Sequence, residues 1–108
     1  MPCLVIHAPS NKPGKTSFKK TVADQKGNRY AINSKIAPKA QPGCTVIVLD
    51  KPWKQRAEGI LVELEFLTGD KAGAGIQRYN VHMKGLKQVP YKPERLNRNG
   101  VNFIEDCP

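Results

Sequence analysis

The chain has 108 residues, of which 39% are hydrophobic, 6% aromatic and 25% charged, and its formal net charge is +9. This length fits one domain, and the composition excludes the disordered and fibrous classes. No apolar run approaches the roughly 20 residues of a membrane-spanning helix, and the segment 1–7 lacks the features of a signal peptide. We therefore expect a single domain over residues 1–108, in the cytoplasm or associated with the nucleoid, with no membrane partner.

The first half of the chain alternates apolar segments with turn residues. In order, the pattern predicts a strand at 3–8, a turn at 9–15, a turn at 26–28, a strand at 29–32 and a proline-broken segment at 33–43 with at most one helical turn. The segment 16–26 fits a short helix or an exposed loop. Phe18 and Val22 have helical spacing and Ser17 is a candidate cap, but two apolar residues make a thin helix.

The second half is richer in strand signals. The pattern predicts a strand at 44–50, a loop at 51–55, a strand at 56–67, a glycine-rich loop at 68–76, a strand at 77–83, a turn at Gly85, an extended segment at 90–100 and a strand at 101–105. Alternation places Ile60, Val62, Leu64 and Phe66 on one face of their strand. Gly59 within that strand indicates a bulge or bend.

Six or seven short strands with little helix define the expected fold class. We predict a mainly β protein, either a small single-domain β-barrel or a strongly bent antiparallel sheet, with at most one or two short helices. Closure into a barrel would also remove exposed sheet edges.

The cysteines give little evidence of a functional site. Cys3, Cys44 and Cys107 are far apart, odd in number and form no CxxC pair, so we expect neither a zinc site nor any other cofactor. The odd count also argues against a secreted disulfide scaffold. Cys44 is expected to be buried, and Cys107 to be exposed and oxidisable.

The positive charge is unevenly distributed. Residues 1–57 hold eleven Lys or Arg and two acidic residues, whereas residues 58–108 hold seven of each sign. All of the net charge therefore falls in the first half. A basic, asymmetric domain is typical of a protein that binds polyanions.

Several residues have the chemistry that nucleic-acid contact requires. Trp53 lies in a Lys- and Arg-rich loop, which suits base stacking combined with phosphate contact. Asn80 lies on the polar face of its strand, where an amide can read a base edge. The residues predicted to contact nucleic acid are Lys12, Lys15, Lys19, Lys20, Arg29, Lys35, Trp53, Lys54, Arg56, Arg78, Asn80, His82 and Lys84.

A second motif points to nucleotides. Residues 9–16, PSNKPGKT, follow an apolar strand and resemble the phosphate-binding loop of nucleoside triphosphatases. The resemblance implies that Gly14, Lys15 and Thr16 bind phosphate and that Asp50 binds magnesium. Pro9 departs from the pattern, because that position needs a glycine with a backbone N–H.

A third pattern concerns the fold family. Pro42-Gly43 before an apolar strand, followed by a basic loop and a strand containing Gly59, resembles the PUA-like superfamily in its ASCH and EVE branches, over about residues 28–83. The resemblance implies a curved β-barrel that binds nucleic acid, often with a base in an aromatic-lined cleft. Trp53 and Tyr79 are the candidates for such a cleft here.

Together these patterns predict a non-catalytic domain that binds DNA or RNA. It would use its basic first half, stacking by Trp53 and the polar strand face around Asn80. Two alternatives remain open. One is a protein-interaction module that docks on an acidic partner, and the other is a nucleotide-binding enzyme that uses the phosphate loop.

Overall fold

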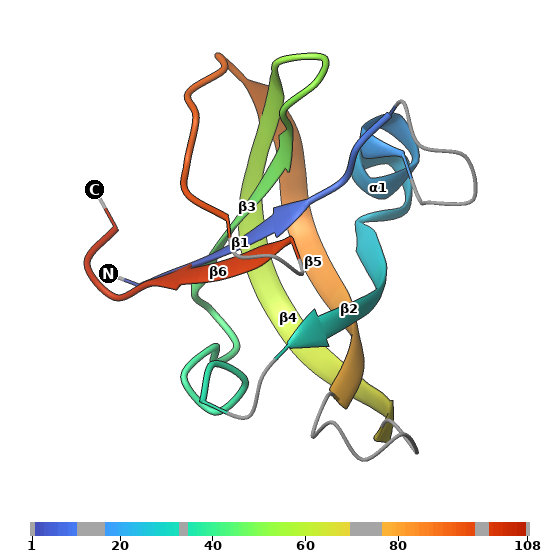
Figure 1. Cartoon of the computed structure of the whole chain (residues 1–108), viewed down its shortest axis with the longest axis vertical. Helices are drawn as coiled ribbons and strands as arrows, with labels where there is room; N and C mark the ends of the chain where they lie inside the picture. The colour runs from blue at the N-terminus through green and yellow to red at the C-terminus, as the bar shows by residue number, and fades with distance from the viewer. Residues whose placement is uncertain (1, 11–16, 33–34, 70–76, 97–99, 108) are drawn as a thin grey trace.

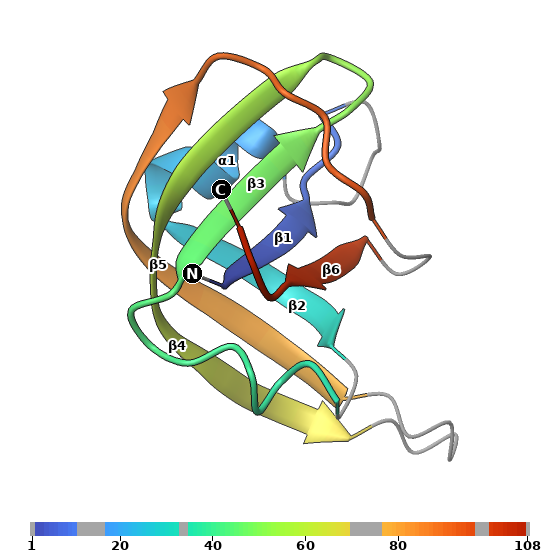
Figure 2. The same cartoon turned by 90° about the vertical axis from the view of Figure 1, so that its left-hand side faces the viewer.

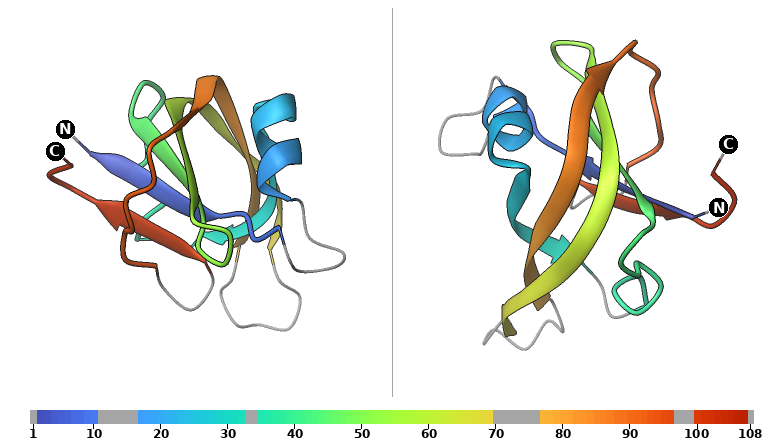
Figure 3. Two further views of the ribbon diagram at one scale, coloured as in Figure 1. Left: turned by 90° about the horizontal axis from the view of Figure 1, so that it is seen from above. Right: turned by 180° about the vertical axis from the view of Figure 1, so that it is seen from behind.

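The structure is a computed structural model that describes residues 2–10, 17–32, 35–69, 77–96 and 100–107. Within these ranges, six strands form one sheet in the order β2-β5-β4-β3-β1-β6, with a short helix beside it (Figure 1). The elements are β1 (Cys3–His7), α1 (Phe18–Asp24), β2 (Lys26–Ile32), β3 (Thr45–Asp50), β4 (Gln55–Gly69), β5 (Gln77–Val89) and β6 (Val101–Ile104). The sheet curls into a half-barrel (Figure 3), which confirms the predicted fold class.

One strand pair departs from the antiparallel pattern. β1 pairs with β3 in parallel, with Val5 opposite Ile47, whereas every other neighbouring pair is antiparallel. A parallel pair needs a crossover connection, and α1 and β2 lie in the chain between these two strands. The parallel pairing brings the carboxyl ends of β1 and β3 to the same edge of the sheet, where the candidate site lies.

The long hairpin of β4 and β5 produces the curvature. Both strands sweep through an arc (Figure 2), and their register shifts at three places, one of them between Glu58 and Ile60. Gly59 lies at that shift, and a Cβ there would be 2.8 Å from the Leu86 Cα. Only glycine allows the two backbones to approach so closely, which confirms the bend predicted at Gly59.

The bulges overturn the face predicted for β4. Leu61 is 1% exposed, whereas Ile60, Val62 and Phe66 are 37%, 43% and 56% exposed. Each register shift adds a residue to one strand and so reverses the inward and outward alternation beyond it. The predicted common face of Ile60, Val62, Leu64 and Phe66 is therefore wrong, since Leu64 packs against the core and the other three are exposed.

The inner face of the half-barrel holds the main core. It is built from buried side chains of β1, β3, β4, β5 and β6, among them Leu4, Ile6, Val46, Val48, Leu61, Val81, Met83 and Val101. Phe18 and Val22 of α1 pack on this cluster, and the Ser17 side chain caps the helix by accepting from the Lys20 N–H. The short helix is thus the correct one of the two alternatives for segment 16–26.

A smaller cluster lies on the outer face of β1 and β3. Cys3, Val5, Ile47 and Leu49 are buried there. Tyr91 and Leu96 of the segment 90–96, here called the strap, pack against them together with Ile104 and Cys107. The strap and the C-terminal segment therefore give the sheet a second buried layer (Figure 2).

Cys3 and Cys107 form a disulfide with a Cα–Cα distance of 5.6 Å. The expectation that Cys107 is an exposed thiol is therefore wrong, because this cysteine is half-buried and disulfide-bonded. The spacing in sequence gave no sign that Cys3 on β1 meets Cys107, which follows the neighbouring strand β6. Cys44 is buried as predicted, and desolvation raises the pKa of its thiol.

Two predicted turns lie inside strands. Lys26–Asn28 belong to β2, and Gly85 belongs to β5. Gly85 has a φ of +63°, a conformation that glycine adopts without strain. The predicted turn at Gly85 is therefore wrong, because the strand continues through the glycine. In the ranges that the structure describes, no helix has the length and apolarity needed to cross a membrane.

Candidate nucleic-acid interface

A groove of about 570 Å³ opens at the edge where β1 and β3 end. Its lining comes from α1, the β3–β4 turn and the strand ends, and consists of Ser10, Ser17, Phe18, Lys19, Val22, Trp53, Gln55 and Gln88. Trp53 is 62% exposed, so most of the indole is open to solvent. The groove thus combines an accessible aromatic side chain, apolar side chains of α1, a lysine and several uncharged polar groups.

Asp50 organises the polar end of this groove. Its carboxylate is fully buried and accepts hydrogen bonds from Ser10 Oγ (2.5 Å) and Gln55 Nε2 (3.1 Å) at Oδ2. At Oδ1 it accepts from the Trp53 backbone N–H (3.4 Å). One side chain therefore joins the end of β1, the start of β4 and the turn that carries Trp53.

The β3–β4 turn holds Trp53 at the groove. Lys54 has a φ of 51°, and its N–H donates to the Lys51 carbonyl (3.2 Å), which closes a tight turn. Pro52 lies within this turn, where its fixed φ is readily accommodated. The turn and the Asp50 contact together fix the backbone from which the indole projects.

Basic side chains surround this end of the half-barrel. Lys19 lines the groove, and Lys51 and Lys54 are exposed on the turn that carries Trp53. Lys20 is exposed on α1 and pairs with Asp24 at 3.4 Å. The structure therefore brings together the predicted contact residues Lys19, Trp53 and Lys54. Lys12 and Lys15 lie outside the described residues.

The predicted basic strand face lies elsewhere. Arg29 is on β2, while Arg78, Asn80, His82 and Lys84 are on β5. Asn80 and Gln88 are eight residues apart on β5, which corresponds to roughly 25 Å along a strand. The two predicted contact surfaces are therefore separate.

Asn80 and His82 are engaged within the fold. Asn80 Nδ2 donates to Glu65 Oε1 (3.0 Å), and Asn80 Oδ1 accepts from the Arg29 N–H (3.1 Å). His82 Nε2 lies 2.7 Å from the same Glu65 oxygen. The hydrogen bonds from His82 and then Asn80 hold the pKa of Glu65 below its ordinary value. Both ends of the buried Asn80 amide are thus occupied, which argues against its predicted role in reading a base edge.

Arg56 is a correction to the predicted contact residues. Its side chain is 7% exposed and bonds to Glu58 (2.9 Å), to Glu94 (2.8 Å) and to the Lys92 carbonyl (2.8 Å). Desolvation lowers the pKa of Arg56, but the two carboxylates outweigh it and raise the pKa overall. The guanidinium therefore anchors the strap and has no exposure for a phosphate.

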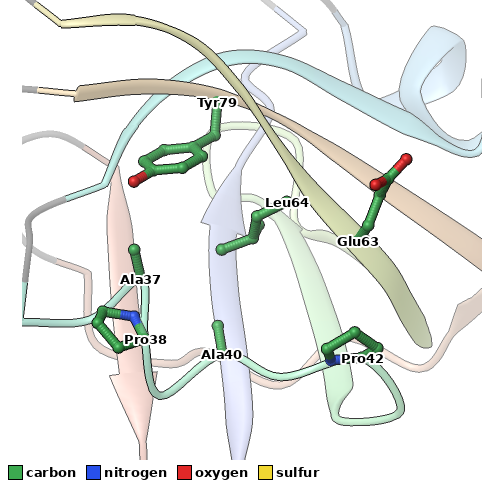
Figure 4. Close-up of a pocket in the computed structure, with 7 residues that line it drawn as sticks. All are labelled: Ala37, Pro38, Ala40, Pro42, Glu63, Leu64 and Tyr79. Atoms are coloured by element: carbon green, nitrogen blue, oxygen red, sulfur yellow. The ribbon is translucent and has the colours of Figure 1, made fainter.

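Tyr79 lies far from Trp53. It lines a separate pocket of about 390 Å³ with Leu64, Glu63 and residues of the 37–42 segment. Figure 4 shows Tyr79 and Leu64 on the strand side of this pocket, with Ala37, Pro38, Ala40 and Pro42 opposite them. The expected cleft containing both Trp53 and Tyr79 is therefore not formed. Lys35 is exposed and begins the 35–39 turn, on this side of the molecule.

The phosphate-loop hypothesis falls mainly outside the described residues. Gly14, Lys15 and Thr16 belong to the part of the chain that is not described. The helix begins at Phe18, with Ser17 in an extended conformation, so these three residues precede the cap. Asp50, the expected magnesium residue, is fully buried, with both carboxylate oxygens accepting protein hydrogen bonds. Within the described ranges, no three His, Cys, Asp or Glu side chains gather as metal ligands would.

Comparisons of the chain with family models, with curated proteins and with solved structures found no match in any of the three. The PUA-like resemblance thus stays a prediction. Fold and site together define a mixed-sheet half-barrel with a tryptophan groove at one end. The sequence patterns did not indicate the polar groove residues Ser10, Gln55 and Gln88. An acidic residue that ends an apolar strand, as Asp50 does, was the signal that could have led to Ser10 and Gln55.

Proposed function

We propose that the protein is a non-catalytic nucleic-acid-binding domain that docks a base against Trp53 in the groove. The observation that carries the proposal is the exposed indole in a groove that also contains Lys19. Stacking on an aromatic side chain contributes about 1–3 kcal/mol per base, and lysines near the backbone add an electrostatic term that depends on salt.

The distribution of charge supports the groove over the strand face. Lys19, Lys51 and Lys54 lie at or beside the groove. On the strand face, Glu65 engages both Asn80 and His82. A polyanion approaching the groove end meets several lysines, whereas one approaching the strand face also meets a carboxylate. This placement is compatible with the PUA-like resemblance, because such domains hold a base in a cleft.

The test is a titration of the protein with labelled single- and double-stranded DNA and RNA, followed by fluorescence anisotropy between about 50 and 200 mM salt. Trp53 is the only tryptophan in the sequence, so its intrinsic fluorescence reports directly on the groove. We expect affinity that falls steeply with salt and quenching of Trp53 that follows the same binding curve.

Lysine variants identify the phosphate contacts. Replacing both Lys19 and Lys20 with Ala should weaken binding to all sequences similarly and flatten the salt dependence. Lys39→Ala is the matched control, because Lys39 pairs with Glu105 away from the groove and should leave the salt slope unchanged. An absence of binding at low salt, or quenching that does not accompany binding, would overturn the proposal.

A different surface favours the alternative of a protein-interaction module. Ile60, Val62 and Phe66 expose apolar area along β4, outside the groove. Exposed apolar area of this kind often marks protein contacts. If this alternative holds, a complex with an acidic protein will survive nuclease treatment and will weaken with Val62→Ser rather than with Trp53→Ala.

A further inference from the structure

We propose that the groove prefers bases that carry an amino group, and that Ser10 and Gln55, oriented by Asp50, set this preference. The inference rests on the proposed function, because it concerns which base lies against Trp53. It follows from the direction of the hydrogen bonds at the polar end of the groove.

The Asp50 carboxylate can only accept hydrogen bonds. Ser10 has a single hydroxyl hydrogen, and it points to Asp50 Oδ2 at 2.5 Å. The oxygen of Ser10 therefore offers the groove lone pairs and no donor. Since Asp50 is itself fully buried, it acts on a ligand through its neighbours and is a positioning residue.

Gln55 is oriented by the same carboxylate. Its Nε2 faces Asp50 at 3.1 Å, because only the amino side of the amide can donate to a carboxylate. Its Oε1 forms no hydrogen bond with any residue that the structure describes. Ser10 and Gln55 both line the groove. After their bonds to Asp50 they retain two acceptor oxygens and one amide hydrogen for a ligand.

This polarity distinguishes the bases. Adenine and cytosine carry an amino donor where hypoxanthine and uracil carry a carbonyl oxygen. An amino group would donate to Ser10 or Gln55, whereas a carbonyl at the same exocyclic position would bring oxygen against oxygen. Sites built to form a hydrogen bond reject analogues that lack the matching group.

The experiment compares ligands that differ in that one group. Trp53 quenching is measured with single-stranded oligonucleotides of cytidine against uridine and of adenosine against inosine, each about eight nucleotides long. Each pair matches ring size, so differences in stacking area largely cancel. We expect the amino-bearing member to bind about fivefold to tenfold more tightly in both pairs.

Variants then test whether Ser10 and Gln55 cause this base preference. Ser10→Ala and Gln55→Ala should each bring the two ratios toward one while the quenching persists. Asp50→Asn keeps the shape but can donate to Ser10 Oγ, which frees the hydroxyl hydrogen for the ligand, so the ratios should fall or invert. Gln88→Ala is the matched control, because Gln88 lines the groove without a hydrogen bond to Asp50, and it should preserve both ratios.

The outcomes separate the inference from the proposed function. Ratios near one in the unmodified protein, with binding and quenching intact, would overturn the base preference and leave nucleic-acid binding standing. Ratios that survive Ser10→Ala and Gln55→Ala would overturn the role of these residues. No binding to any oligonucleotide at low salt would overturn both. If Asp50→Asn does not fold, the Ser10→Ala variant still tests the role of these residues, because Ser10 is half-exposed and its substitution should be tolerated.

Discussion

Gln55 and Arg56 are consecutive residues of β4, yet they belong to polar clusters on opposite faces of the sheet. Arg56 joins Glu58 and Glu94 under the strap, where each carboxylate meets a guanidinium. Gln55 joins Ser10 at Asp50, a buried carboxylate whose hydrogen-bond donors among the described residues are all uncharged. In the first cluster the charges compensate one another within the fold, and in the second cluster acceptor oxygens face an open groove.

The difference indicates what each cluster does. A buried ion pair with additional hydrogen bonds fixes the segments that carry it, and here it ties the strap to β4. Among the described residues, Asp50 has only neutral donors to offset the desolvation of its carboxylate, which is a costly way to stabilise a fold. The outer cluster therefore serves structure, while the inner cluster fits a role in arranging a binding groove.

The largest expected effect concerns the disulfide that closes the outer face. Cys3 and Cys107 are 104 residues apart, so their link should stabilise the protein by about 4–5 kcal/mol through the entropy of the unfolded chain. We expect Cys107→Ser to lower the free energy of unfolding by this amount, measured by urea denaturation. Reductant should lower the midpoint of the unmodified protein and leave that of the variant unchanged. An unmodified protein indifferent to reductant would contradict the assignment.

The next effect tests the ion pairs of the outer cluster. Arg56→Ala leaves the half-buried Glu94 without its guanidinium and should cost about 3 kcal/mol in the free energy of unfolding. Arg95→Ala is the control, because Arg95 lies on the same strap with an exposed side chain and should change stability by less than about 0.5 kcal/mol. Equal stability of the two variants would remove the distinction between the two faces.

A smaller effect tests the groove, and it should appear in binding rather than in folding. Trp53→Ala removes an exposed indole and should weaken nucleic-acid binding by about 1–3 kcal/mol, a factor of roughly 5 to 150, with little change in stability. The measurement is anisotropy at low salt together with urea denaturation. Phe66→Ala is the control, since Phe66 is comparably exposed but lies outside the groove lining. Equal losses for both variants would place the interface elsewhere.

The sequence was sufficient for features that depend on neighbouring residues. Alternation and turn residues predicted the strands, and Gly59 marked the bend. The number of residues that each bulge inserts was not predictable, because it depends on how β4 meets β5, and so Leu64 was wrongly placed on one face with Ile60 and Val62.

Features that depend on distant residues were out of reach. Lys54 and Arg56 belong to one basic segment, and only the contact with Glu94, 38 residues away, separates the buried residue from the exposed one. Ser10 and Asp50 are 40 residues apart and meet because β1 and β3 are parallel, a pairing that local periodicity does not encode. The lysines near Trp53 were identified because charge and turn chemistry are local properties.

The smallest expected effect concerns Glu65, which belongs to an exposed polar cluster with His82 and Asn80. Hydrogen bonds from His82 and Asn80 lower the pKa of Glu65 in the folded state. Its contribution to stability should therefore be full above the ordinary glutamate pKa and should disappear as the pH falls through the lowered value. Glu65→Gln should be slightly less stable than the unmodified protein at pH 7, with the difference shrinking toward pH 3 in urea denaturation.

Glu63→Gln provides the control, because Glu63 is a neighbouring exposed carboxylate with no ion pair among the described residues. Solvent screens the exposed Glu65 cluster, so its effect should be smaller than that of the buried Arg56 cluster. A pH-dependent difference in the free energy of unfolding as large as the effect of Arg56→Ala would contradict this order.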